Sequence, residues 1–105
     1  MFKLTIMYAV GAEQFFDFDY YLIHHIPMSI RLQGKAIRTV QVEQGYESDL
    51  PEITCKYRTI CHFTYDSEQA FLDAFLPVAE TLQSDIPRFT DSDPIIQFSN
   101  LLLSQ

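Results

Sequence analysis

The chain has 105 residues, of which 48% are hydrophobic and 20% are charged, and its 14 acidic against 7 basic residues give a formal charge of −7. This composition is typical of one globular domain, and we expect residues 1–105 to form it. The lack of a basic run argues against nucleic acids and anionic membranes as partners, since both bind through Lys and Arg. Without a transmembrane or signal-peptide pattern, the expected location is cytoplasmic.

The first half of the chain predicts a strand followed by a long helix. Apolar residues alternate over residues 2–8, which is the period of a strand with one buried face. A helix is expected from Asp17 to Gln33, with Asp17 as its N-cap and Gly34 as its stop. Because Pro27 lacks a backbone amide, we expect the helix to kink there.

This first helix has two apolar sides on a wheel of 100° per residue. One side holds Phe18, Tyr21, Leu22, His25, Met28 and Leu32, and the other holds Tyr20, Ile23, Ile26 and Ile30. We therefore expect the helix to be covered on both sides. A narrow polar seam between them contains Asp17, His24 and Arg31 and should face solvent, so that His24 is expected at the surface.

The second half predicts two strands, a helix and a last strand. Residues 35–47 and 54–65 alternate as strands, the second of them dense in Thr, Ile, Tyr and Phe. A helix should begin at Asp66 as N-cap, with Gln69 three positions later able to reach back to it. Residues 95–103 are largely apolar and predict a strand that is buried on both faces.

The order of these elements, β-α-β-β-α-β, indicates a fold class. It is the α+β, ferredoxin-like arrangement, in which a four-stranded antiparallel sheet carries two helices on one face. The chain is too short to cover the other face of the sheet, and the strands are apolar. We therefore expect a homodimer in which the sheets of two copies face each other.

Two groups of residues carry a resemblance to a known family. They are Phe16-Asp17-Phe18-Asp19-Tyr20-Tyr21-Leu22 with His25-Ile26-Pro27, and Asp85-Ile86-Pro87-Arg88-Phe89-Thr90-Asp91 with Pro94 and Gln97. With the strand between them, they resemble the EthD family over nearly the whole chain. The resemblance implies a dimeric α/β barrel of two ferredoxin-like subunits, with an apolar cavity between sheet and helices. The family name comes from bacterial degradation of ethyl tert-butyl ether, and related barrels include cofactor-free monooxygenases, polyketide cyclases and lactone isomerases.

The resemblance points to His25 and Tyr21 as catalytic candidates. His25 takes the place of the histidine in the family's His-x-Pro motif, and Tyr21 that of the second tyrosine of its pair. In an apolar pocket a neutral imidazole can act as a general base, and a tyrosine one helical turn earlier can orient it or bind a substrate oxygen. The alternative for both is a structural role in the core, with hydrogen bonds to neighbouring groups.

Further residues are expected to bind the ligand in the cavity. They are Tyr20, His62, Gln97, Phe18 and Met28. His62 would meet His25 if its strand turned that face toward the first helix. For His62 and Gln97 the alternative is structural, because a buried polar group in a strand can simply tie neighbouring strands together.

No metal site or cofactor is expected. Spacings such as Cys-x-x-Cys or His-Glu-x-x-His are missing, as are flavin, nicotinamide and haem motifs. Asp85, Asp91 and Asp93 lie next to prolines, and turn and cap chemistry explains them without a cation.

These observations favour a protein that binds a small, mostly apolar organic molecule. If it is an enzyme, proton transfer next to a carbonyl fits best, as in an isomerase, dehydratase or cyclase of degradation or secondary metabolism. One alternative is a cofactor-free monooxygenase that acts on a phenolic substrate. Another is a non-catalytic binding or accessory protein, and the sequence leaves all three open.

Overall fold

A computed structural model describes residues 1–11 and 15–105. Its strands are β1 (Phe2–Ala9), β2 (Thr39–Gln44), β3 (Tyr57–Tyr65) and β4 (Ile95–Asn100). The first helical segment consists of α1 (Phe18–Tyr20), the π-helix η1 (Tyr21–His25), α2 (Ile26–Gln33) and the 3₁₀ turn η2 (Gly34–Ala36). The second consists of α3 (Glu68–Phe75), η3 (Leu76–Val78), α4 (Ala79–Asp85) and η4 (Ile86–Arg88).

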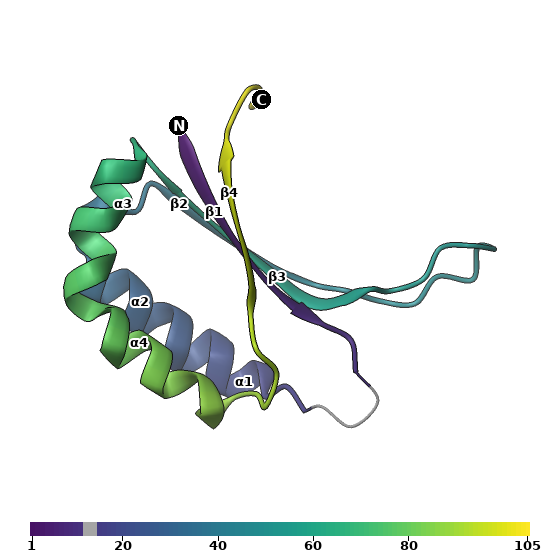
Figure 1. The fold of residues 1–105 in the computed structure, drawn as a ribbon. Helices are drawn as coiled ribbons and strands as arrows, with labels where there is room; N and C mark the ends of the chain where they lie inside the picture. Colours follow the sequence, from purple (N-terminus) through teal and green to yellow (C-terminus); the bar gives the residue numbers. More distant parts are fainter. Residues whose placement is uncertain (12–14) are drawn as a thin grey trace.

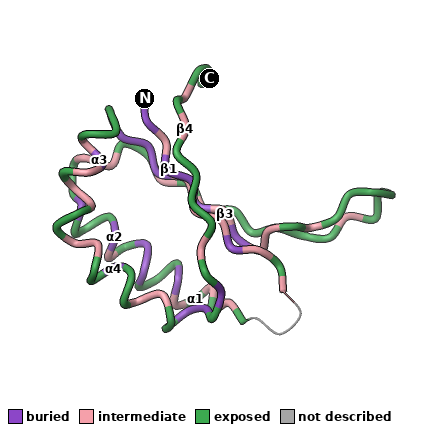
Figure 2. Tube along the Cα trace, in the orientation of Figure 1, coloured by how far each residue is buried: buried purple, intermediate pink, exposed green. Residues whose placement is uncertain are grey.

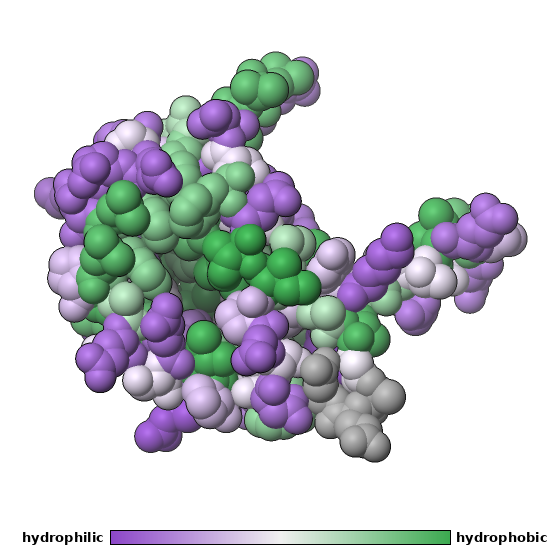
Figure 3. Space-filling view, in the orientation of Figure 1, coloured by the Kyte–Doolittle hydropathy of each residue, from purple (hydrophilic) through white to green (hydrophobic). Residues whose placement is uncertain are grey.

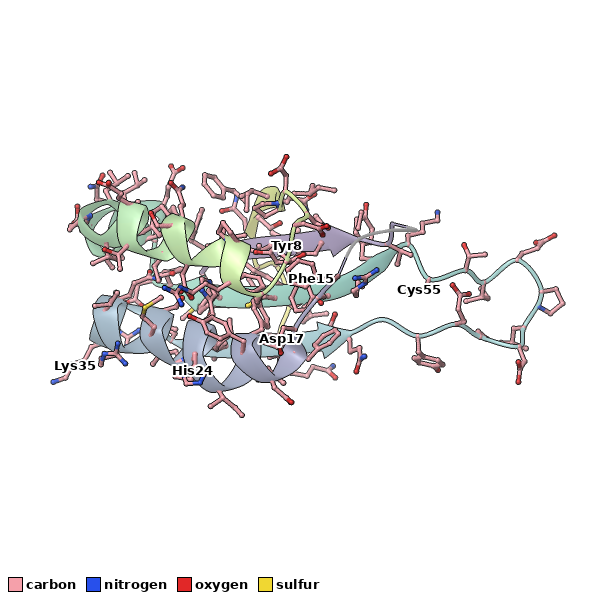
Figure 4. All side chains as sticks on the ribbon, turned by 90° about the horizontal axis from the view of Figure 1, so that it is seen from below. Tyr8, Phe15, Asp17, His24, Lys35 and Cys55 are labelled. Carbon is pink, nitrogen blue, oxygen red and sulfur yellow. The ribbon has the colours of Figure 1, made fainter. Side chains whose placement is uncertain are left out.

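The sheet has the strand order β2-β3-β1-β4, and every neighbouring pair is antiparallel. The two helical segments lie on one side of it (Figure 1) and run next to each other (Figure 4). This order is that of the ferredoxin-like fold, so the α+β prediction is confirmed.

The core lies between the sheet and the helices. Along β1, Phe2, Leu4 and Tyr8 are buried on the side of the helices. The Phe2 ring stacks on that of Phe71 in α3, with centroids 5.4 Å apart, and the Tyr8 ring packs edge-on against Tyr21 in η1. Figure 2 shows that buried residues concentrate on β1, β3 and the inner side of the helices. The buried residues Phe2, Leu4 and Tyr8 are among those that the alternation over residues 2–8 placed on one buried face.

The opposite face of the sheet has no helix on it and is more polar than expected. One cross-strand row consists of Ile60, Met7 and Ile95, and the next consists of His62, Thr5 and Gln97. We call these two rows, together with Gln41 and Glu43 of β2, the open face. Its apolar groups are limited to the first row, so this face is less apolar than the sequence indicated.

The last strand also differs from its prediction. It ends at Asn100, and Ile95, Ile96 and Phe98 are exposed although we expected burial on both faces. The reason is its place at the edge of the sheet, next to β1 alone, where the helices do not fully cover it. Leu102 and Leu103 follow it and are also exposed.

The first helical segment begins as predicted but winds differently. The Asp17 carboxylate accepts a hydrogen bond from the backbone N–H of Tyr20 at 3.0 Å, which confirms its role as N-cap. Ahead of Pro27, the N–H of Ile26 donates to the carbonyl of Tyr21, five residues back, so the backbone forms a π turn. Gly34 ends α2 with a φ of 64°, in the region that favours glycine.

The π turn explains why the helical wheel was partly wrong. It adds a residue to one turn, so residues on either side of it no longer follow 100° per residue. The buried residues from here to the end of α2 are Tyr21, His25, Ile26, Ser29 and Gln33. Leu22, Ile23, Ile30 and Leu32, which we expected in two covered stripes, are exposed.

The second helical segment begins one residue later than predicted. The Ser67 hydroxyl accepts from the N–H of Ala70 and is the N-cap of α3. Asp66, which we predicted for this role, instead binds the Arg38 guanidinium through both carboxylate oxygens, at 2.9 and 2.7 Å. A bidentate pair with arginine satisfies the carboxylate more fully than a single backbone amide would.

The chain between β2 and β3 projects from the body of the molecule (Figure 1). Both strands are shorter than predicted, and the connection runs over residues 45–56. It carries exposed apolar residues, among them Tyr46 and Leu50. No helix within the two described ranges has the length and hydropathy needed to cross a membrane.

Candidate functional site

A pocket of about 140 Å³ lies between the helical segments and the sheet. The space-filling view shows a hollow in this region with hydrophobic groups around it (Figure 3). Its apolar wall includes Leu4, Ile6, Phe63, Phe75, Leu82 and Ile96. The size is close to that of an engineered cavity of about 150 Å³ that holds benzene, so the pocket can take one six-membered ring.

A second, wider hollow of about 440 Å³ lies near the N-terminus. It is lined by Met1 and Phe2, by the first residues of α3, and by the end of β4. It is open to solvent, and its titratable side chains are the carboxylates of Asp66 and Glu68. Because Asp66 is already bound to Arg38, this hollow offers less acid–base chemistry than the enclosed pocket.

His25 is a polar residue of the pocket wall, and its ring forms a hydrogen bond with a carboxylate. It closes the π-helix, is 8% exposed, and lies 2.9 Å from Asp85 between Nδ1 and Oδ2. A carboxylate can only accept, so Nδ1 carries the proton and donates it to Asp85. The second ring nitrogen, Nε2, is then unprotonated in the neutral ring. The pair therefore supplies an oriented base at the wall of an apolar pocket.

Asp85 has two further partners. The Tyr20 hydroxyl donates to Oδ1 at 2.7 Å, and the exposed Arg88 side chain lies 3.6 Å from the same oxygen. Tyr20 and His25 come from the first helical segment, and Asp85 ends α4. The carboxylate thus joins the two helical segments beside the pocket. We refer to Tyr20, Asp85 and His25 as the Asp85 cluster.

The electrostatics of the cluster keep the imidazole neutral and the carboxylate ionised. Burial lowers the pKa of His25 below its ordinary value, and the hydrogen bond and charge of Asp85 offset this only in part. For Asp85, burial acts to raise the pKa, but the hydrogen bonds from His25 and Tyr20 outweigh it and the pKa is lowered. The hydrogen bond to Asp85 raises the pKa of Tyr20, so this tyrosine stays protonated.

Aromatic rings support His25 from the core. The Tyr21 ring stacks on the imidazole with centroids 5.7 Å apart and planes 13° apart, and the Phe89 ring lies 4.6 Å away. Tyr21 is 1% exposed, and burial, with the neighbouring Cys61 thiol on β3, raises its pKa. Tyr21 therefore lies under His25, on the side of the sheet, and is not one of the residues that line the pocket.

Two uncharged polar residues extend the site along α2. Ser29 and Gln33 follow His25 at intervals of four residues, and all three line the pocket. Gln33 accepts the Tyr65 hydroxyl at Oε1, at 2.6 Å, which leaves its amide N–H groups for another partner. Ser29 is 4% exposed, and its hydroxyl can donate to or accept from a group in the pocket.

Comparison with known proteins supports the fold and shows a similarity to EthD-like proteins. No protein-family model and no curated protein matches the sequence. Among solved structures, an EthD-like protein from Ralstonia eutropha JMP134 superposes with a TM-score of 0.91, at 27% identity over 99% of this chain and 94% of that one. The chain resembles EthD-like proteins in sequence and in fold.

Other structures share the EthD fold at lower identity. An ethyl tert-butyl ether D family protein from Bacillus halodurans C-125 is 19% identical, with a TM-score of 0.73 over 97% of this chain and 99% of that one. SnoaB, a cofactor-independent oxygenase from Streptomyces nogalater, is 12% identical, with a TM-score of 0.55 over 98% and 93%. At these identities the likeness concerns the fold.

The structure separates the site residues expected for an EthD protein into two groups. Tyr20, Tyr21 and His25 come together beside the pocket. His62 and Gln97 lie on the open face, on the other side of the sheet, where the Nδ1 atom of His62 is 3.3 Å from the Thr5 hydroxyl and its Nε2 atom 3.5 Å from Glu43. His62 therefore does not meet His25, because side chains alternate along β3 and that of His62 lies on the face away from the helices.

Phe18 and Met28 do not line the pocket either. Phe18 opens α1 and packs on the Phe16 ring, with centroids 4.7 Å apart, and Met28 is half-buried on α2. His24 is exposed, as expected, and its ring lies against that of Tyr20.

Three residues of the site were missed in the sequence. We assigned Asp85 to turn chemistry, although it comes directly before the Ile-Pro of the family motif, and that motif was the signal that could have identified it. Ser29 and Gln33 follow His25 at a spacing of four, which places them on the same face of a regular helix, and this spacing was the signal that could have identified them. Among the described residues, no group of three or more His, Cys, Asp or Glu is arranged to hold a metal ion.

Proposed function

We propose that this EthD-like protein binds a small, mostly apolar organic molecule and moves a proton on a carbon next to its carbonyl group. The observation that carries the proposal is the Nδ1–Oδ2 hydrogen bond of 2.9 Å between His25 and Asp85 at the wall of an apolar pocket. An oriented, neutral imidazole in such a place is a general base.

The proposed step uses the Nε2 atom of His25. Its lone pair takes a proton from the carbon next to the carbonyl, and the C–H electron pair moves into an enolate. The imidazolium that forms is stabilised by the Asp85 carboxylate, and it returns the proton to the same carbon or to another. Return to another carbon is an isomerisation. If the imidazolium instead protonates a hydroxyl on the β-carbon, the C–O bond breaks, water leaves and the enolate electrons form the new C=C bond, which is a dehydration. Tyr21, predicted to share in the catalysis, would hold the imidazole plane by stacking.

The test is the exchange of carbon-bound hydrogen. We would incubate the protein with small ketones in D₂O and follow loss of the α-proton signals by NMR. We expect exchange with the wild type and at least a hundredfold slower exchange with H25A, the magnitude being about that of general-base catalysis. The matched control is H24A, one residue earlier and exposed, which should exchange like the wild type. Equal rates for H25A and the wild type would contradict the proposal.

Two other outcomes would assign a different function. Consumption of dioxygen with a phenolic compound would indicate a cofactor-free monooxygenase, the activity class that SnoaB carries on a similar fold. Ligand binding without exchange or oxidation, unchanged in H25A, would indicate a non-catalytic binding or accessory protein. The same proposal includes a cytoplasmic location. It also includes a role in degradation, such as ether degradation, or in secondary metabolism.

We also propose that a second copy of the chain covers the open face. The row of Ile60, Met7 and Ile95 provides an apolar centre, and the polar side chains of His62 and Gln97 lie in the row next to it. A symmetric pair can place such groups opposite each other, because a two-fold interface brings one patch against itself. The expected particle in light scattering is a dimer.

A further inference from the structure

We infer that the ligand of this pocket is a one-ring compound with a second oxygen at the end away from His25, bound by Ser29 and Gln33. This inference rests on the proposed function for its orientation, since it takes the carbonyl end to lie at His25. It adds a binding subsite and a substrate class that the base alone does not define.

The first argument is the position of Ser29 and Gln33. Both face the pocket from α2, at four and eight residues after His25. At a rise of about 1.5 Å per residue, their Cα atoms lie about 6 and 12 Å further along the helix axis. A ligand that reaches from the imidazole toward these residues must therefore be elongated, with one polar group near each end.

The second argument is that both side chains offer hydrogen-bonding groups to the pocket. The Tyr65 hydroxyl donates to Oε1 of Gln33, which fixes the amide and leaves the N–H groups of Nε2 as donors. Ser29 is 4% exposed and lines the pocket, and its hydroxyl is not among the fully buried, unpaired atoms of the described residues, where Thr59 Oγ1 is found. A hydroxyl and an amide N–H that line the pocket side by side can both bind an oxygen of the ligand.

The third argument is the shape and chemistry of the remaining wall. It is mostly apolar, with side chains such as Leu4, Phe63 and Phe75, and its other polar residues are Tyr8 and Gln83. The volume of about 140 Å³ suits one ring. A charged second group is disfavoured, because none of the residues around Ser29 and Gln33 on the pocket wall carries a charge. A phenol fits, since its oxygen can accept from Gln33 and its proton can be donated to Ser29.

The experiment compares two probes of nearly equal size, 4-hydroxyphenylacetone and 4-methylphenylacetone, by titration calorimetry at pH 7. The wild type should bind the hydroxyl compound about tenfold more tightly, which is the order expected for one or two hydrogen bonds. S29A should lose most of this preference while binding the methyl compound unchanged. The control is S84A, an exposed serine on α4, which should behave like the wild type.

A second variant tests Gln33 without removing it. Y65F deletes the hydroxyl that fixes the Gln33 amide, so the preference for the hydroxyl compound should fall two- to fivefold. This variant can be used even if replacement of Gln33 itself unfolds the protein. The inference is overturned if the wild type does not distinguish the two probes, if it binds neither up to 10 mM, or if S29A weakens both equally.

The outcome is independent of the test of the base. Preference for the hydroxyl compound without α-proton exchange would support the subsite and contradict proton transfer. Exchange without preference would support proton transfer and contradict the subsite.

Discussion

The Asp85 carboxylate holds the His25 imidazole by a hydrogen bond of 2.9 Å between residues that are 60 positions apart in the chain. His25 ends the π-helix of the first helical segment, and Asp85 ends α4 of the second. The bond sets the proton on Nδ1, frees Nε2, and ties the two segments at one end of the pocket. The carboxylate also opposes the lowering of the His25 pKa by burial.

Replacing Asp85 with Asn should lower the pKa of His25 further. Burial already lowers this pKa, and Asp85 is the group that opposes the effect. Removing its charge leaves burial unopposed, so the imidazole becomes a weaker base and α-proton exchange at pH 7 should slow by about ten- to a hundredfold. The pKa is read from the pH dependence of the His25 ring signals in NMR.

The matched control is D49N, in the projecting connection between β2 and β3, where the side chain is far from the imidazole in sequence and exposed. It should leave the His25 titration unchanged. A higher His25 pKa in D85N would contradict the assigned role of Asp85.

The free energy of unfolding should decrease as the pH falls below about 6.5. The pKa of His25 is lowered in the folded protein from an ordinary value of 6.5, so the unfolded chain binds the proton more readily. Stability therefore rises with pH in this window and is lost as pH falls toward the folded pKa. The pKa of Asp85 is also lowered, which adds a second loss below its ordinary value of 3.8.

Urea unfolding at several pH values measures this dependence. H25Q removes the titrating group and should flatten the curve between pH 7 and pH 5, whereas H24Q, at an exposed position, should keep the wild-type slope. A slope that H25Q does not change would show that another group controls stability in this range.

The fold could be predicted from the sequence because its signals are local. Alternation along β1, the Asp17 cap and the Gly34 stop each depend on a few adjacent residues, and each is found in the structure. The site was harder, since it depends on how one helix winds. His25 was identified by its motif, but the π turn before Pro27 decides how residues on its two sides are placed relative to each other, and a wheel of fixed angle does not contain it.

Pairings over long sequence distances could not be read from periodicity at all. Asp85 and His25 meet only because the sheet brings the ends of two helical segments together. The side of the sheet on which His62 lies depends in the same way on register, which sets it opposite Thr5.

The cap of α3 gives a direct test of a corrected assignment. Ser67 accepts the N–H of Ala70, and loss of an N-cap hydroxyl costs about 1 kcal/mol, so S67A should lower the free energy of unfolding by about that amount. Asp66 binds Arg38 at the surface, where such pairs contribute about 0–1 kcal/mol, so D66A should cost less. Urea unfolding of the two variants, side by side, checks the order. A larger loss in D66A would restore Asp66 as the cap.

A lysine at the centre of the open face should separate the proposed dimer. Ile60 lies between Met7 and Glu43 across the strands, so a lysine there can pair with Glu43 in a single subunit and leave its fold intact. Between two sheets the same charge would be buried, at a cost of several kcal/mol. I60K should therefore have the mass of one chain in light scattering, with wild-type circular dichroism.

The control for this prediction is I23K, on the outer side of the first helical segment, where the side chain is 64% exposed and no second sheet is expected. It should stay dimeric. A wild type with the mass of one chain would contradict the dimer. An I60K variant that remains a dimer while I23K separates would place the contact elsewhere than on the open face. The second result would assign the contact to the exposed apolar side of the helix, where Leu22, Ile23 and Ile30 are left uncovered by the π turn.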